Sequence, residues 1–407
     1  MTATDSPAIK RTRWDVIILT TAAGLLAAFQ IGKIPAALPD LRSELVIGFV
    51  AAGWIASILS ITSALFGVTA GLLSDRFGHR RLLLTNLAIM AVGSAMGGIA
   101  PDTGWLLVSR ILEGVAFLGL MVSVPSLLLQ AVTAHQQPFV LGLWSARMPV
   151  GMAIMIVVSP PLLIEIGWRG IWFVNTGLSI FLLLAIAART RGLPPLVANT
   201  SASLGRDLRL ALTRPGPWLL GACFMAYAAI WMTVMTWLPT FLIESAGLSL
   251  GTAAAVSALI VICNAPSNIF AAWLAQRGVR TWPMVALPAL IMGVLGYFLF
   301  SDLTGEAAKV PIAMAMSFVG GFLPGAVIIA VPRHSPSPAQ VGAVNGIVMQ
   351  GSNIGQLFGP PLLAIVVTWS GGWDNSGWLM LVIGIFGASL AFGVRLIEGR
   401  DERTKST

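Results

Sequence analysis

The chain has 407 residues, of which 57% are hydrophobic and only 10% are charged, and its formal net charge is +8. A soluble fold keeps so much surface in contact with water that it cannot hide this much apolar side chain. The composition therefore excludes a soluble enzyme and a nucleic-acid-binding protein, and it indicates an all-α membrane protein whose excess positive charge reports topology.

Twelve largely apolar runs are long enough to cross a bilayer as helices, which takes about 20 residues each. They cover 14–38, 46–70, 82–100, 104–130, 139–164, 170–188, 216–243, 249–274, 282–300, 309–331, 341–368 and 376–397. The connections are short except for 189–215, which is rich in arginine, proline and serine. We therefore predict an N-terminal six-helix bundle over 1–190, a cytoplasmic linker over 191–215 and a C-terminal six-helix bundle over 216–407.

The basic residues support this topology. If the N-terminus is cytoplasmic and the spans alternate, 18 of the 24 Lys and Arg residues fall on the cytoplasmic side and 3 on the outer side. Cytoplasmic loops of membrane proteins carry such an excess. The pattern predicts an even number of spans, with both termini in the cytoplasm of a bacterial-type inner membrane.

Residues 200 positions apart repeat without gaps. The segment 160–163 and the segment 360–363 both read Pro-Pro-Leu-Leu, and Gly78 corresponds to Gly278. A parallel repeat of this kind predicts two bundles related by a pseudo-two-fold axis along the membrane normal, with the substrate path between them.

The segment after the second span carries a glycine, an acid and several arginines at fixed spacing. It reads Gly71-Leu-Leu-Ser-Asp75-Arg76-Phe-Gly78-His79-Arg80-Arg81. With the twelve spans and an arginine four residues before a glycine in the fourth span, it resembles the major facilitator superfamily, whose pattern here is G-x-x-x-D-R-x-G-R-R. His79 departs from that pattern. The resemblance implies a transporter that works by alternating access.

We expect this loop to form a cytoplasmic latch between the bundles, made by Gly71, Asp75, Arg76, Gly78 and Arg80. Asp75 would accept charge-assisted hydrogen bonds from arginines. The alternative is that the arginines only anchor the loop on the cytoplasmic side.

Two features bear on the branch of the superfamily. The segments around Lys33, Gly53 and Trp168 resemble the cyanate- and nitroimidazole-permease-like branch. The fifth span has Pro149 and Gly151 but not the G-P-x-x-G-G pattern of drug–proton antiporters, which disfavours drug efflux.

Ionisable side chains inside the spans are costly, and they usually face a bundle interior or a water-filled cavity. Away from their ends, the spans contain Lys33, Arg110, Glu113 and Arg147, three cations against one acid. This surplus predicts a cavity for an anion, with Lys33 and Arg147 binding the substrate. Arg110 and Glu113, three residues apart, are predicted to couple transport to protons, Glu113 exchanging the proton while Arg110 holds it ionised.

Each of these charged residues has a simpler interpretation. Lys33 would then only extend to the outer membrane surface, and Arg110 and Glu113 would only neutralise each other. Arg147 would pair with Glu113 or a backbone carbonyl.

The second half offers neutral polar groups instead. Asn345, Asn353 and Gln356 fall on one face of the eleventh span, Asn264 lies in the eighth span, and Tyr227 lies in the seventh. We predict that these five residues contact the substrate. The alternatives are hydrogen bonds between helices for the amides and simple packing for Tyr227.

The two cysteines and three histidines show no disulfide or metal-ligand spacing, so no metal or cofactor is expected. We expect a secondary active transporter, not an enzyme, that acts as a monomer in the lipid bilayer.

Its predicted partners are a small anionic solute and protons. The alternative function is a proton-antiport efflux pump for a neutral or cationic drug-like compound. An embedded enzyme or a receptor is disfavoured because the spans carry neither an acidic dyad nor paired His and Cys residues.

Overall fold

The computed structural model describes residues 12–191, 212–335 and 340–406, and over these residues it is helical without strands. A bilayer offers no partners for backbone N–H and C=O groups, so spanning segments must satisfy these groups internally, as helices do. The predicted all-α fold is confirmed. Most of the predicted linker over 191–215 lies outside the described residues.

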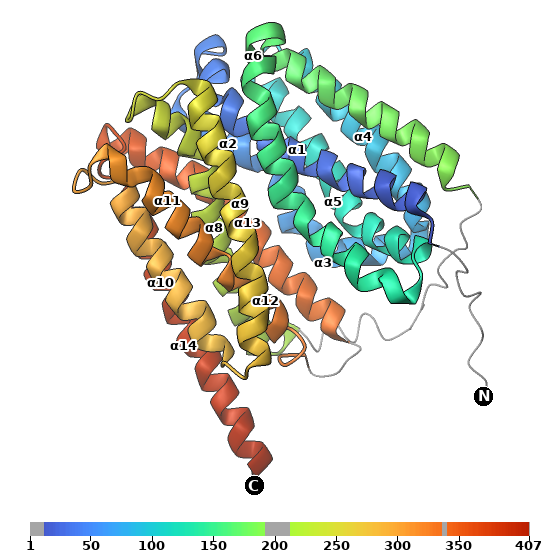
Figure 1. Cartoon of the computed structure of the whole chain (residues 1–407), viewed down its shortest axis with the longest axis vertical. Coiled ribbons are helices and arrows are strands. Elements are labelled where there is room, and N and C mark those ends of the chain that lie inside the picture. The colour runs from blue at the N-terminus through green and yellow to red at the C-terminus, as the bar shows by residue number, and fades with distance from the viewer. Residues whose placement is uncertain (1–11, 192–211, 336–339, 407) are drawn as a thin grey trace.

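The first half folds into one bundle (Figure 1). Its helices are α1 (Trp14–Glu44), α2 (Phe49–Ser57), η1 (Ile58–Ser60), α3 (Ile61–Phe77), α4 (His79–Gly98), α5 (Thr103–Ala131), η2 (Ala134–Gln136) and α6 (Gln137–Arg189). The start of α5 is fixed by Asp102, whose carboxylate accepts a 2.8 Å hydrogen bond from the Trp105 N–H and so satisfies one free donor of the first turn.

The second half folds into a second bundle beside it, visible as the yellow-to-red ribbons of Figure 1. Its helices are α8 (Pro215–Glu244), α9 (Leu250–Gln276), α10 (Thr281–Leu299), α11 (Glu306–Gly320), α12 (Phe322–Ala330), α13 (Val341–Ser370) and α14 (Gly377–Ser406).

The described helices make twelve membrane crossings, as predicted. Ten stretches are long and apolar enough to span a bilayer. One of these, Phe139–Arg189, crosses twice, because α6 bends at Gly167 (φ 65°, ψ 177°), between the spans predicted at 139–164 and 170–188. The helix that corresponds to the predicted span at 341–368 is α13, which has 30 residues and contains several amide side chains.

Two predicted runs, 46–70 and 309–331, are not continuous α-helices. The first is interrupted by η1, and the second divides between Gly320 and Phe322. Pro324 explains the second break, because it cannot donate a hydrogen bond to the Gly320 carbonyl. Gly321 also allows α9 to approach closely, since a Cβ added there would lie 2.2 Å from the Asn264 carbonyl oxygen.

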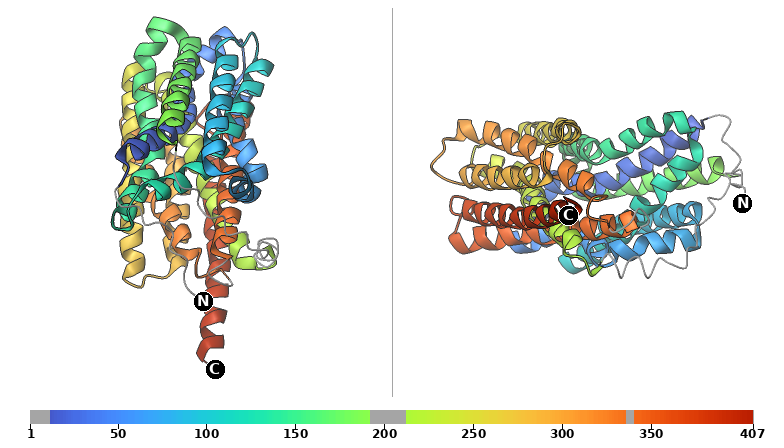
Figure 2. Two further views of the ribbon diagram at one scale, coloured as in Figure 1. Left: turned by 90° about the vertical axis from the view of Figure 1, so that its right-hand side faces the viewer. Right: turned by 90° about the horizontal axis from the view of Figure 1, so that it is seen from below.

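The repeat is visible in the backbone. Gly78 and Gly278 connect equivalent helices with φ angles of 82° and 83°, a left-handed conformation that glycine adopts without strain. Three interfaces join the bundles in the described part of the chain: α1 packs against α8, and a related pair of interfaces forms where α2 and α3 meet α13 and where α6 meets α9. A shift of 200 residues exchanges the two interfaces of this pair, as a pseudo-two-fold axis requires. The right-hand view of Figure 2, from below, also shows the two bundles side by side.

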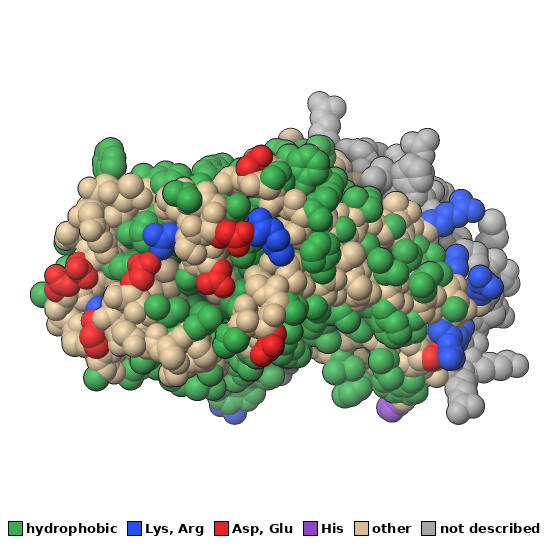
Figure 3. All heavy atoms as spheres, turned by 90° about the horizontal axis from the view of Figure 1, so that it is seen from above, with side chains coloured by type: hydrophobic (Ala, Val, Ile, Leu, Met, Phe, Trp, Pro, Cys, Tyr) green, Lys and Arg blue, Asp and Glu red, His purple; other side chains and the backbone are tan. Residues whose placement is uncertain are grey.

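Charge is segregated along the molecule. On the face in Figure 3, acidic side chains gather toward one end, and mostly Lys and Arg appear at the other, with apolar side chains between them. This arrangement agrees with the positive-inside pattern of the sequence.

Candidate functional site

A charged cluster lies inside the first bundle. Lys33 on α1 and Arg110 and Glu113 on α5 are all 0% exposed. One carboxylate oxygen of Glu113 accepts a hydrogen bond from Lys33 Nζ at 2.6 Å and one from Ser94 Oγ on α4 at 2.7 Å. The other oxygen lies 2.5 Å from Arg110 Nη1. Glu113 is therefore shared by two cations.

Neutral groups complete this cluster. Gln30 Oε1 accepts a second hydrogen bond from Lys33 at 2.6 Å, and Gln30 Nε2 donates to Asn175 on α6. The ammonium of Lys33 lies 4.1 Å from the centre of the Trp172 ring, a cation–π contact. We call Gln30, Lys33, Ser94, Arg110 and Glu113 the N-bundle charge cluster.

Arg110 links this cluster to the interruption in the second span. Its Nη1 also donates to the Gln30 carbonyl at 2.8 Å, and its Nε donates to the Ile55 carbonyl at 3.1 Å, near the end of α2. The remaining nitrogen, Nη2, is buried and has no hydrogen-bond partner in the described structure.

Arg147 lies apart from this cluster. Its guanidinium lies 3.5 Å from the centre of the Trp144 ring, and its Nη1 donates to the Trp144 carbonyl at 2.6 Å. The side chain packs against Gly24 of α1. Lys33 lies nine residues further along α1, which corresponds to roughly 13 Å along the helix axis. The three cations of the spans therefore occupy two separate places.

Arg147 has no acidic partner among the described residues. It is half-buried, contacts the Met121 thioether on α5, and leaves its Nε buried without a hydrogen-bond partner. A guanidinium that is largely removed from water and unpaired favours the binding of an anion.

The second bundle carries an uncharged polar group at mid-span. Asn264 Nδ2 donates to the Tyr227 hydroxyl at 3.3 Å and to the Ser317 carbonyl at 2.9 Å, and Tyr227 stacks between Phe224 and Trp231. The Trp231 ring is partly exposed, while its Nε1 is buried and unpaired in the described structure. This group joins α8, α9 and α11 and presents one aromatic face.

The amides of α13 and its glycines occupy different sides of the helix. Gly351, Gly355 and Gly359 pack directly against backbone atoms of α8. On another side, Gln350 Nε2 donates to the Ala64 carbonyl of α3 at 2.6 Å, a link between the bundles. Asn345, Asn353 and Gln356 are half-buried. Asn353 and Gln356 donate only within α13, to the Met349 carbonyl and the Ser352 hydroxyl, which leaves their carbonyl oxygens available.

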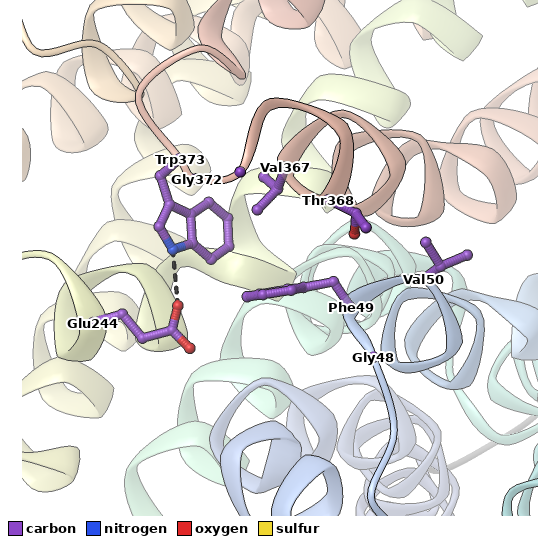
Figure 4. Close-up of a pocket in the computed structure, with 9 residues that line it drawn as sticks. Gly48, Phe49, Val50, Glu244, Val367, Thr368, Gly372 and Trp373 are labelled. Carbon is purple, nitrogen blue, oxygen red and sulfur yellow. Dashed lines mark hydrogen bonds between the residues drawn. The ribbon is translucent and has the colours of Figure 1, made fainter.

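The bundles are also joined where α1 and α8 end, on the side predicted to be the outer one. Arg42 at the end of α1 forms a 2.8 Å ion pair with Glu244 at the end of α8, and Glu244 also accepts a 2.9 Å hydrogen bond from Trp373 Nε1. The Phe49 ring contacts both Trp237 and Trp373. Beside these groups lies a pocket of about 440 Å³, with Glu244 and Trp373 on one side and Phe49 and Val50 on the other (Figure 4).

The predicted latch is only partly described. The backbone of Gly71, Asp75 and Arg76 belongs to α3, but their side chains lie outside the described residues. Gly78 begins the next helix in a left-handed conformation. Arg80 donates to Thr190 Oγ1 at 2.8 Å and to the Ala187 carbonyl at 3.0 Å, so it binds the last turn of α6 within its own bundle.

Sequence reasoning missed several members of these groups. Ser94, Trp172 and Asn175 lie in predicted spans, but only charged residues were searched for there in the first half. Asparagine and serine inside an apolar run were the available signal, because a buried polar group requires a partner. The ion pair of Arg42 with Glu244 had no such signal, because both lie in ordinary outer connections.

The comparisons with known proteins agree on one family. The model of the Major Facilitator Superfamily matches residues 20–340. The Hexuronate transporter of Bacillus subtilis is 25% identical over 415 residues, covering 96% of this chain and 97% of that protein. The Cyanate transport protein CynX of Escherichia coli is 25% identical over 324 residues, covering 77% and 79%.

The fold also matches solved structures. A bacterial homologue of the human lysosomal transporter Spinster, in an inward-facing and occupied conformation, superposes with a TM-score of 0.80 at 16% identity. That match covers 95% of this chain and 97% of the other.

Proposed function

Because the chain belongs to the major facilitator superfamily, a family of membrane transporters rather than enzymes, we propose that it moves a small anionic solute by alternating access, coupled to protons. It acts as a monomer in a bacterial-type inner membrane, with both termini in the cytoplasm. The positive-inside pattern of the sequence supports this orientation.

The observation that carries the anionic substrate is the environment of Arg147. A half-buried guanidinium with an unpaired Nε and no acidic neighbour among the described residues needs a counter-charge or water. A carboxylate fits, because the planar fork of arginine matches its two oxygens. The stacking on Trp144 holds the guanidinium in place by its face, and the unpaired Nε lies on its edge.

Two relatives support the sign of the substrate. Two transporters that match most of this chain are named for hexuronate and cyanate, and both of these are anions. The two substrates differ greatly in size, so the common element we carry to this chain is the negative charge.

The remainder of the solute contacts the second bundle. We assign this role to Tyr227, Asn264, Asn345, Asn353 and Gln356, which supply an aromatic face and amide carbonyl oxygens. Carbonyl oxygens accept hydrogen bonds from hydroxyl groups. A hydroxylated carboxylate such as a hexuronate would bind both bundles at once, with its carboxylate at Arg147 and its hydroxyl groups at the amide carbonyl oxygens of the second bundle.

Proton coupling is assigned to the N-bundle charge cluster, which includes Arg110 and Glu113. The cluster lies within the bundle interior, and Arg110 connects it to the interrupted second span at Ile55. Alternating access requires the outer contact of Arg42 with Glu244 to separate when a cytoplasmic contact forms. Gly71, Asp75, Arg76, Gly78 and Arg80 supply that cytoplasmic latch in our proposal.

A thermal-shift measurement on the purified protein tests the substrate charge. The probes are glucuronate, cyanate and the permanent cation tetraphenylphosphonium. We expect an anion to raise the unfolding temperature of the wild type, less in Arg147→Lys and not at all in Arg147→Ala. The matched control is Arg277→Ala, which removes another arginine stacked on a tryptophan, at the end of α9, and should retain the full shift.

The opposite result would support the efflux alternative. Stabilisation by tetraphenylphosphonium that persists or increases in Arg147→Ala would contradict an anionic substrate. It would indicate an export protein for cationic compounds instead.

A further inference from the structure

Building on the proton coupling proposed above, we propose that Lys33, rather than Glu113, is the side chain that releases and regains the coupled proton. The sequence alone pointed to Glu113, because it is the one acid in the spans away from their ends. The arrangement of the N-bundle charge cluster assigns the coupled proton to Lys33 instead.

The first argument is the charge of the cluster. Lys33, Arg110 and Glu113 are all 0% exposed, and Glu113 is the only acid that contacts the two cations in the described structure. The other groups in contact with Lys33 or with its partners are neutral: Gln30 and Trp172 contact Lys33 itself, Ser94 contacts Glu113, and Asn175 contacts Gln30. With all three groups ionised the cluster carries one uncompensated positive charge, which is costly away from water.

The second argument identifies which group can remove that charge. Arg110 keeps its proton under all ordinary conditions. Protonation of Glu113 would leave both cations without a counter-charge, so it increases the imbalance. Loss of a proton from Lys33 makes the cluster neutral, with the N–H bond broken, the electron pair left on nitrogen and the proton passed to water when the cluster opens.

The third argument is that the neutral amine remains satisfied. An uncharged lysine retains two N–H groups, and the structure offers Lys33 two acceptors, Glu113 Oε1 and Gln30 Oε1, each at 2.6 Å. Both hydrogen bonds survive the loss of the proton. The hydrogen bonds from Lys33 to Glu113 and Gln30 are therefore possible in either protonation state of the lysine.

The structure also connects this proton to the outer closure. When Lys33 is neutral, Glu113 interacts electrostatically with Arg110 alone, and Arg110 also binds the Ile55 carbonyl of α2. Two residues earlier on α2, Gly53 packs against Pro361 of α13 in the other bundle. A change in the charge of Lys33 therefore acts on the helix that closes the outer side.

The test is an NMR titration of the full-length protein in lipid nanodiscs, with ¹³C at the ε-carbon of lysine. The chain has only four lysines, Lys10, Lys33, Lys309 and Lys405, and the variant Lys33→Met assigns the signal of Lys33. We expect this signal to change from the ammonium to the amine position between about pH 6 and pH 9, a range in which an ordinary lysine with a pKa of about 10.4 stays charged. In Glu113→Gln it should remain at the amine position throughout.

A Lys33 signal that stays at the ammonium position over the whole range would overturn the proposal. A second result would also overturn it: chloride raises the unfolding temperature of the wild type but not that of Arg110→Lys. A chloride ion bound at Arg110 Nη2 would then balance the extra positive charge, and Lys33 would not need to lose its proton. Lys33→Met leaves the neutral pair of Arg110 with Glu113, so we expect it to fold, and Lys33→Gln provides a second folded variant.

Transport in proteoliposomes separates this proposal from the proposed function. With glucuronate as the probe, Lys33→Met should lose accumulation driven by a pH gradient and keep exchange of internal for external glucuronate. Gradient-driven accumulation by Lys33→Met at the wild-type level would refute the role of Lys33 alone. Exchange without gradient-driven accumulation in the wild type would refute proton coupling itself.

Discussion

Lys33 Nζ and Glu113 Oε1 lie 2.6 Å apart between α1 and α5, although 80 positions separate the two residues in the chain. Removing the acid leaves the buried guanidinium of Arg110 without a counter-charge, whereas removing the lysine leaves the neutral pair of Arg110 with Glu113. We therefore predict that Glu113→Gln lowers the free energy of unfolding by about 3–5 kcal/mol and that Lys33→Met lowers it much less.

Thermal unfolding in detergent measures this difference. The control is Glu165→Gln, which alters an exposed acid beside the bend of α6 at Gly167 and should leave the unfolding temperature unchanged. Equal unfolding temperatures for Glu113→Gln and Lys33→Met would contradict the role of Glu113 as the common counter-charge of Lys33 and Arg110.

The packing of α13 on α8 depends on Gly355. A Cβ added there would lie 2.1 Å from the Met225 carbonyl oxygen, which is backbone and cannot move aside. We predict that Gly355→Ala destabilises the protein by about 1–3 kcal/mol. Gly342→Ala is the matched control, because it is on the same helix with no atom within 4 Å of the added Cβ. A milder effect of Gly355→Ala than of Gly342→Ala in thermal unfolding would rule out this close packing.

Val46 adopts a left-handed conformation with φ of 51°, in the turn that corresponds to Gly247 with φ of 63° in the other half. A β-branched residue is strained in this region by about 1–2 kcal/mol, and glycine is not. Val46 is 90% exposed, so little packing is lost on replacement. We predict that Val46→Gly raises the unfolding temperature and that the reverse change, Gly247→Val, lowers it. An unfolding temperature that falls in Val46→Gly would show that the turn is not strained.

Glu244 holds the outer ends of the two bundles together through Arg42. We predict that Glu244→Gln favours the outward-open state, since a partly exposed ion pair contributes up to about 1 kcal/mol, or roughly a fivefold population change. The measurement is the rate at which an impermeant maleimide labels Val50→Cys in the outer pocket. Glu306→Gln, at the exposed start of α11, should leave the rate unchanged. If labelling of Val50→Cys does not accelerate in Glu244→Gln, this ion pair does not hold the outer side closed.

Most of the helical framework could be predicted because it depends on local chemistry. Each apolar run forms a helix on its own in a membrane, since only neighbours in sequence can satisfy its backbone groups. The separation of the fifth and sixth spans was also predicted, because the apolar runs end at 164 and resume at 170, on either side of Gly167. The interruption at η1 was not visible, because Arg110, from a different helix, binds the Ile55 carbonyl beside it.

The residue types of the candidate site could also be predicted, but their grouping could not. The sequence placed Lys33, Arg110 and Arg147 in one cavity for an anion because only their signs and depths could be read from it. Which face of each helix points inward depends on how the helices rotate against one another. That rotation brings Lys33 to Glu113 and leaves Arg147 on Trp144, next to Gly24.

The sequence by itself determined the membrane class, the twelve crossings, the repeat and the surplus of positive charge, because hydrophobic length and charge are properties of single segments. The tertiary structure alone decided that Glu113 is shared by two cations, that Arg147 stands apart, and that Arg42 meets Glu244 across the bundles. These relations join residues from different helices. Their energies depend on distance and burial, which exist only once the helices have packed.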